Sequence, residues 1–114
     1  MPGKYCVVLV TAPNRNTAQH LTHALLRERA AACVSQMHGL ESSFWWKGAI
    51  DRAEETLLII KTRKDRFKKV TTLVSKHHPY EVPEILALPV LAGHAPYLKW
   101  LDLSLKPKAK RRKA

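Results

Sequence analysis

The chain has 114 residues, 46% of them hydrophobic, which is enough for one compact domain with a single core and too little for two. A formal net charge of +11 would ordinarily suggest nucleic acid or an acidic membrane as a partner, but the charge is unevenly placed. Six positive charges fall in the last nine residues, which contain no side chain able to anchor them in a core. We therefore predict one domain over residues 1–105 and a disordered basic tail over residues 106–114.

The distribution of apolar residues and cysteines argues against two further classes of protein. No stretch approaches the roughly 18 consecutive apolar residues of a membrane span, and the apolar run after Lys4 is too short for a secretion signal. Cys6 and Cys33 have no C-x-x-C spacing, so neither a zinc knuckle nor a disulfide scaffold is expected. We expect a cytoplasmic protein with two buried free thiols.

The first half of the chain begins with the run YCVVLV, which predicts a central strand over residues 4–11. Apolar residues at helical spacing then predict a helix to about Arg29. Two extended segments follow, and they meet at Lys47 and Gly48, because glycine accepts the positive φ of a tight hairpin. They predict one long antiparallel hairpin. Polar residues before the helix are its candidate caps: Asn14, Asn16 and Thr17.

The second half predicts a helix, a strand and a short last helix. Asp65 is a candidate cap for the helix, and Pro79 ends it, because the residue before a proline avoids the α conformation. Residues 83–90 predict a fourth strand, and Pro96 suits the first turn of the last helix. The resulting order βαββαβ is that of an α+β, ferredoxin-like fold. The inward side of the second helix carries Phe67, Val70, Val74 and His77.

The adjacent histidines His77 and His78 have two interpretations. Neighbouring side chains on a helix point about 100° apart, so the pair is poorly placed to hold one ion unaided. In the structural interpretation, His77 packs on the inner side of its helix, and one or both rings contact the last helical carbonyls. A metal site would need a third donor, preferably a thiolate for copper or zinc.

The carboxylates Glu81 and Glu84 also have two interpretations. They form either an acid–base pair or a salt bridge and a turn.

The aromatic residues of the hairpin indicate a surface for association. Trp45 and Trp46 are adjacent and therefore lie on opposite faces of a strand, so they cannot both be core in a small domain. A hairpin this long also leaves unpaired backbone edges beyond a sheet of about four strands, which oligomerisation would cover.

Several of these motifs together resemble the CutA divalent-cation tolerance family in order and spacing. The resemblance covers nearly everything from Tyr5 to Leu105 and leaves out the basic tail. Its most distinctive element is HPY followed, after two residues, by PEI. The matching motifs are TAPN at 11–14, AACV at 31–34, FWWKG at 44–48, IKT at 60–62, HHPYEVPEILALPV at 77–90 and YLKWL at 97–101.

The resemblance implies a ferredoxin-like fold similar to the PII signalling proteins, assembled as a homotrimer whose hairpins pair between subunits. It implies a non-enzymatic protein of metal-ion response that binds a divalent metal ion, copper above all. It also implies a cleft between subunits that binds a small ligand or ion, as in PII-like signalling. The cleft residues carried over are Cys33, Trp46, Lys61, Tyr80 and Glu84.

The metal ligands implied by the resemblance are His77 and His78, with a cysteine that some members place just before the TAP element. That position here is Val10. Without the thiolate, we expect copper binding that is weakened or made by histidine alone. Cys6 lies about 13 Å away at strand spacing and is no direct substitute.

Two rival functions follow from other features. The basic tail, KPKAKRRKA, would anchor the chain on nucleic acid without sequence specificity, since the domain lacks an RRM-type aromatic strand. Acylphosphatase-like hydrolysis would need an anion-binding loop after the first strand with a suitably placed arginine. Arg15 follows Pro13 and Asn14 without a glycine to form that loop.

Overall fold

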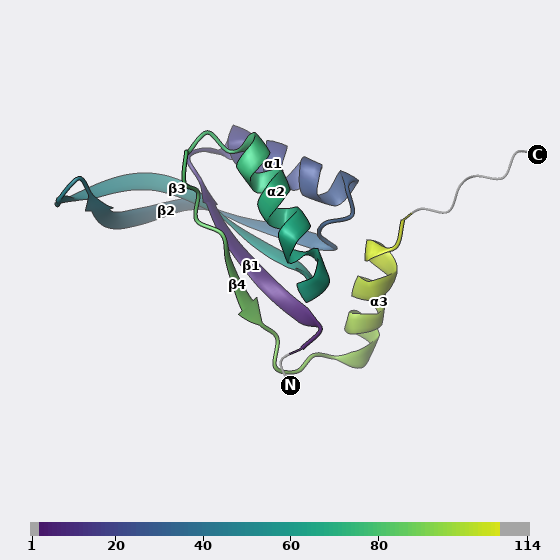
Figure 1. Cartoon of the computed structure of the whole chain (residues 1–114). Coiled ribbons are helices and arrows are strands. Elements are labelled where there is room, and N and C mark those ends of the chain that lie inside the picture. The colour runs from purple at the N-terminus through teal and green to yellow at the C-terminus, as the bar shows by residue number, and fades with distance from the viewer. Residues whose placement is uncertain (1–2, 108–114) are drawn as a thin grey trace, which may run out of the picture.

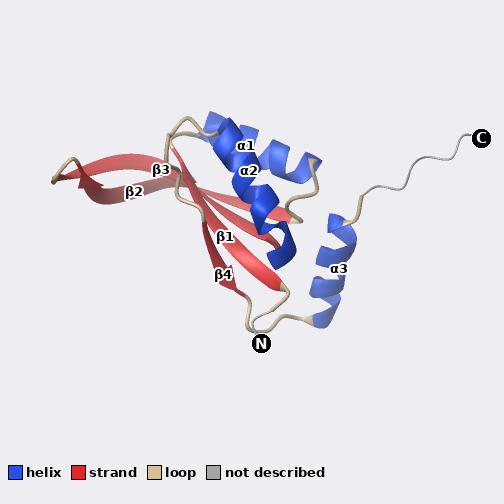
Figure 2. Ribbon diagram, in the orientation of Figure 1, coloured by secondary structure: helices blue, strands red, loops and turns tan. Residues whose placement is uncertain are grey.

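Residues 3–107 are described by the computed structural model of the chain, and the predicted α+β order is confirmed (Figures 1 and 2). The strands form one antiparallel sheet in the order β2-β3-β1-β4. Most of the predicted tail lies outside the described residues. Among residues 3–107, no helix is long and apolar enough to cross a membrane. The elements are β1 (Tyr5–Ala12), α1 (Arg15–Arg27), β2 (Cys33–Trp46), β3 (Ala49–Arg63), the 3₁₀ turn η1 (Lys64–Arg66), α2 (Phe67–His77), β4 (Leu86–Pro89) and α3 (Ala95–Leu105).

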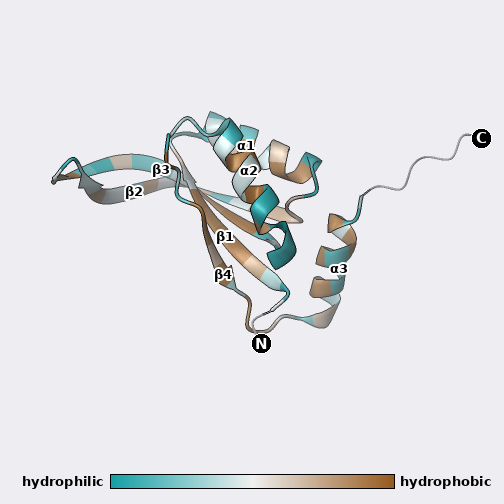
Figure 3. Ribbon diagram, viewed as in Figure 1, coloured by the Kyte–Doolittle hydropathy of each residue, from teal (hydrophilic) through white to brown (hydrophobic). Residues whose placement is uncertain are grey.

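The central strand β1 divides the molecule into a covered and an open face. Successive side chains of a strand point to opposite sides, and here Val8 and Val10 are fully buried, whereas Val7 and Leu9 are only partly buried. Helices α1 and α2 lie together over the covered face (Figure 1). Figure 3 shows apolar residues along β1 and β4. The core on the covered face includes Ala18, Leu21 and Leu25 of α1, Leu58 and Ile60 of β3, and Val70 and Val74 of α2.

Local signals for caps and turns are confirmed at two places. The side chain of Asn14 accepts a hydrogen bond from the backbone N–H of Thr17 at 2.8 Å, which caps α1. Lys47 and Gly48 form the hairpin tip with φ of 49° and 79°, a left-handed pair typical of a tight hairpin turn.

Three predicted details are corrected. Asp65 does not cap α2, because the 3₁₀ turn precedes the helix and the Asp65 carboxylate instead accepts from the Arg63 guanidinium at 2.7 Å. Helix α1 ends at Arg27, because the chain turns left-handed at Arg29, where φ is 57°. The fourth strand is limited to residues 86–89, which pair with only four residues of β1, so residues 83–85 belong to the preceding connection.

The β2–β3 hairpin projects beyond the sheet as a long arm (Figure 2). An irregularity between Met37 and Leu40, with Gly39 at a φ of 76°, interrupts the register and shifts the later residues of β2 by one position. Both faces of the arm tip are exposed, as expected for two adjacent tryptophans: Trp45 is 73% exposed and Trp46 59%. A single chain therefore leaves the aromatic residues of its arm uncovered.

Helix α3 is held at the other end of the sheet by Asp102. Its carboxylate accepts from the Tyr5 hydroxyl at 2.8 Å and from the Arg63 guanidinium at 3.2 Å, and it lies 3.6 Å from the Lys4 ammonium. The hydrogen bond from Tyr5, together with the charges of Lys4 and Arg63, lowers the pKa of Asp102. This network fixes α3 beside the open face.

Replacing the buried Leu25 by alanine is expected to lower the free energy of unfolding by about 2–5 kcal/mol, because it leaves a cavity under α1. Leu26, its neighbour, is 40% exposed, so Leu26→Ala is the matched control and should cost much less. Urea unfolding of both variants measures the difference. Equal losses would contradict the assignment of the two faces of α1.

Candidate functional site

Helix α2 ends at the histidine pair, as predicted. His77 is its last residue, and His78 leaves the helix with extended backbone, φ −86° and ψ 137°, because Pro79 follows. The backbone N–H of His78 still donates to the carbonyl of Val74 at 2.8 Å. This change of backbone direction sends the two imidazole rings to different partners.

The ring of His78 is buried, and both of its nitrogens are hydrogen-bonded. Nδ1 accepts from the backbone N–H of Tyr80 at 3.1 Å, so the ring proton lies on Nε2, which donates to the carbonyl of Thr11 at 2.8 Å. Only 7% of the residue is exposed. These bonds tie the segment after α2 to β1. A metal ligand at His78 would have to give up one of them.

The ring of His77 is partly exposed and meets a histidine of the other helix. Its Nδ1 lies 3.0 Å from Nε2 of His20, in α1, and the two rings are nearly perpendicular at 75°. The helical pattern of the sequence places His20 on an outward side of α1, and 57 positions separate the two residues. Sequence reasoning missed this pair, because no local signal reports how two helices align.

Cys33 and Lys61 lie opposite each other on neighbouring strands, so two predicted cleft residues are brought together. The Lys61 ammonium lies 3.7 Å from the Cys33 sulfur and donates to the hydroxyl of Ser35 at 2.5 Å. Cys33 is half-buried, which corrects the expectation of a buried thiol. Cys6 is buried as expected, and burial raises the pKa of its thiol.

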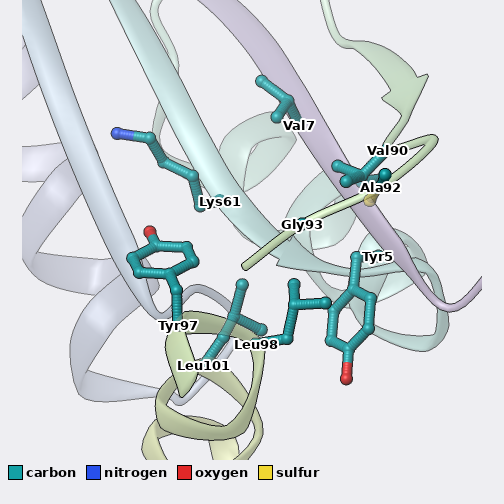
Figure 4. Close-up of a pocket in the computed structure, with 10 residues that line it drawn as sticks. Tyr5, Val7, Lys61, Val90, Ala92, Gly93, Tyr97, Leu98 and Leu101 are labelled. Carbon is teal, nitrogen blue, oxygen red and sulfur yellow. The ribbon is translucent and has the colours of Figure 1, made fainter. Parts of the chain in front are cut away.

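A cavity of about 220 Å³ lies beside Lys61, between the sheet and α3 (Figure 4). Tyr97 of α3 is on its wall, and burial, with a contribution from Cys33, raises the pKa of the Tyr97 phenol. Neither Tyr97 nor the cavity was predicted as part of a site. The other walls are mainly apolar and include Tyr5, Val7, Val90, Leu98 and Leu101.

Tyr80 and Glu84 form a second group, with Glu55 of β3. The Tyr80 hydroxyl donates to the Glu55 carboxylate at 3.1 Å. Burial, and then the negative charge of Glu55, raise the pKa of Glu84. Sequence reasoning missed Glu55, which is only 8% exposed. The sequence feature that could have identified Glu55 is the alternation of side chains along β3, which places Glu54 and Glu55 on opposite faces of the strand.

The five predicted cleft residues therefore occupy three places in one chain. Trp46 is at the arm tip, and six positions of β3, about 20 Å at strand spacing, separate Glu55 from Lys61. The cleft between subunits stays a prediction. Within residues 3–107, no three histidine, cysteine or acidic side chains gather as a metal site. Val10, where the resemblance has a cysteine, is fully buried.

The profile of the family described as CutA1 divalent ion tolerance protein matches residues 6–104. The chain belongs to this family. Protein CutA 1, chloroplastic, from Oryza sativa subsp. japonica is 42% identical over 88% of the chain, and divalent-cation tolerance protein CutA from Yersinia pestis is 41% identical over 87%. The chain spans just over half of the rice protein, 56%, and 83% of the Yersinia protein.

Solved CutA structures have the same fold. CutA1 from Oryza sativa superimposes with a TM-score of 0.87 at 40% identity, over 91% of this chain and 96% of that one. The divalent cation tolerance protein from Thermus thermophilus gives a TM-score of 0.84 at 43% identity, over 85% and 94%. The sequence motifs that resemble the CutA family thus identified it correctly.

Replacing Glu55 by glutamine is expected to lower the pKa of Glu84 part of the way to its ordinary value. The nearby negative charge is removed, while burial remains. An NMR titration of the side-chain carboxyl of Glu84 measures the change. Glu54→Gln, on the neighbouring exposed residue, is the control and should leave the pKa of Glu84 in place. An unchanged pKa in Glu55→Gln would contradict the arrangement.

Proposed function

We propose that the chain is a non-enzymatic protein of divalent metal-ion response that binds copper and works as a homotrimer. The observation that carries the metal-binding part is the imidazole of His77, which is held at the end of α2 and is partly exposed. The resemblance assigns a copper ligand to this position. Several relatives are named divalent-cation tolerance proteins.

The donor chemistry favours copper over magnesium and calcium. Imidazole is a good ligand for copper, zinc and nickel, whereas magnesium and calcium take oxygen donors. Affinity for divalent ions at nitrogen sites generally peaks at copper. The resemblance implies His78 as a second ligand, but both of its ring nitrogens are already hydrogen-bonded, and binding an ion would break one of these bonds. Because Val10 stands where some family members have a cysteine, the proposed ligands here are histidine and water.

The exposed apolar surface supports self-assembly. On the open face and along β4, Leu86 is 56% and Leu88 49% exposed, although both belong to a sheet. The arm adds Trp45 and Trp46. Exposed apolar patches of this kind usually mark protein contacts, and the outer strands β2 and β4 each have one free edge in a single chain. Two further copies of the chain are the proposed occupants.

The absence of catalysis is proposed on the arrangement of the polar residues. In the part of the chain that the structure describes, Cys33 with Lys61 and Tyr80 with Glu84 lie in separate groups. In the proposed cleft between subunits, these groups would bind a small ligand, as in PII-like signalling, and not react with it.

Calorimetric titration of the full chain with Cu(II) is expected to show saturable binding, whereas Mg(II) should give no saturable heat, because the proposed site offers nitrogen donors. A buffer that does not chelate copper is required. Saturable Mg(II) binding of similar strength, or no binding of Cu(II), would contradict the proposal.

A further inference from the structure

We propose that the copper ligands of this chain are His20 and His77, one from each helix, rather than the adjacent pair at the end of α2. This inference rests on the metal-binding function proposed above and names its site. The remaining coordination positions would be filled by water. The site lies on the outer surface of the two helices and is separate from the cavity beside α3.

The distance between the two ring nitrogens suits a shared ion. Two nitrogens that each lie about 2.05 Å from one ion are about 2.9 Å apart at a right angle and about 3.3 Å apart at a tetrahedral angle. Nε2 of His20 and Nδ1 of His77 are 3.0 Å apart. This separation is close to that of neighbouring ligands in the tetragonal geometry that Cu(II) prefers. In the hydrogen-bonded pair the two facing nitrogens point at each other. Each ring would therefore have to turn its facing nitrogen by about 45° from the line that joins the nitrogens to reach an ion held at a right angle.

The helices hold the two rings in place before an ion arrives. Leu21, next to His20, is 1% exposed, and Val74, three residues before His77, is fully buried, so both backbones are fixed by the core. The ring centroids are 4.7 Å apart. A preorganised pair of ligands binds more tightly than two free side chains, because less conformational entropy is lost on binding.

The pair can exchange its hydrogen bond for a metal ion without a net change of protons. Two neutral imidazoles that share this bond have a proton on only one of the facing nitrogens. When the ion binds, that ring transfers the proton through solvent to its other nitrogen, and both facing lone pairs become ligands. His78 is in a different situation, because its hydrogen bonds to Thr11 and Tyr80 use both nitrogens.

The surroundings of the pair limit which ions can bind. Within residues 3–107, no third histidine, cysteine or carboxylate completes a three-ligand group there. Lys76, next to His77, is exposed and positively charged. A site of two neutral imidazoles near positive charge excludes magnesium and calcium and is open to copper, nickel and zinc, with copper bound most tightly.

Four single variants of the full chain test the assignment: His20→Gln, His77→Gln, His78→Gln and His23→Gln. Each is titrated with Cu(II) by calorimetry, and thermal melting checks that it is folded. His23 is exposed on α1 and outside the pair, so it is the matched control. We expect His20→Gln and His77→Gln to weaken Cu(II) binding by about tenfold or more, and His23→Gln and His78→Gln to leave it within about twofold.

The outcomes separate this inference from the function on which it rests. Binding that is lost in His77→Gln and His78→Gln but kept in His20→Gln would overturn the inference and leave copper binding intact. Binding that no variant changes would overturn the inference too. If the unaltered chain binds no Cu(II), both fail. Because His78→Gln can destabilise the fold, electron paramagnetic resonance of the Cu(II)-loaded chain gives a second measure. We expect two coordinated imidazoles in the unaltered chain and one in His20→Gln. Two coordinated imidazoles in both would overturn the inference.

Discussion

The arrangement of this molecule depends on the pairing of β1 at the centre of a sheet that α1 and α2 cover on one face, while α3 lies beside the other. Because alternate residues of β1 point to opposite faces, Val8 and Val10 belong to the core under α1 and α2, while Val7 and Leu9 face the open side. The covered face supplies the stability of the single chain. The open face, with the cavity beside α3 and the exposed leucines of β4, is left for binding (Figure 3).

The β2–β3 arm is a second part of the molecule that a single chain leaves uncovered. Past Ala12, where β1 ends, the β2–β3 hairpin has no third strand and no helix to pack on among the described residues, 3–107. Tryptophans are costly to leave in water, so we propose that those at the arm tip contact another copy of the chain. In this account, stability comes from the helix side, and assembly from the open side and the arm. The metal site that we propose lies on the helices, away from these proposed assembly surfaces.

Local chemistry explains how much of this could be predicted from the sequence. The run YCVVLV, the cap at Asn14, the turn at Lys47 and the stop at Pro79 each depend on neighbouring residues, and all are found in the structure. The family motifs are local too. The His20–His77 and Tyr80–Glu55 contacts depend on how distant elements align, which no local pattern reports. Asp65 failed as a cap because an ion pair with Arg63 competed for its carboxylate.

The most direct test of the central claim, that the open face and the arm are contact surfaces between copies of the chain, is the mass of the full chain in solution by light scattering. The account predicts a mass three times the 13.0 kDa of one chain, unchanged over a wide range of concentration. A mass of one chain at concentrations where the protein is folded would contradict it. The exposed apolar surface would then need a different partner.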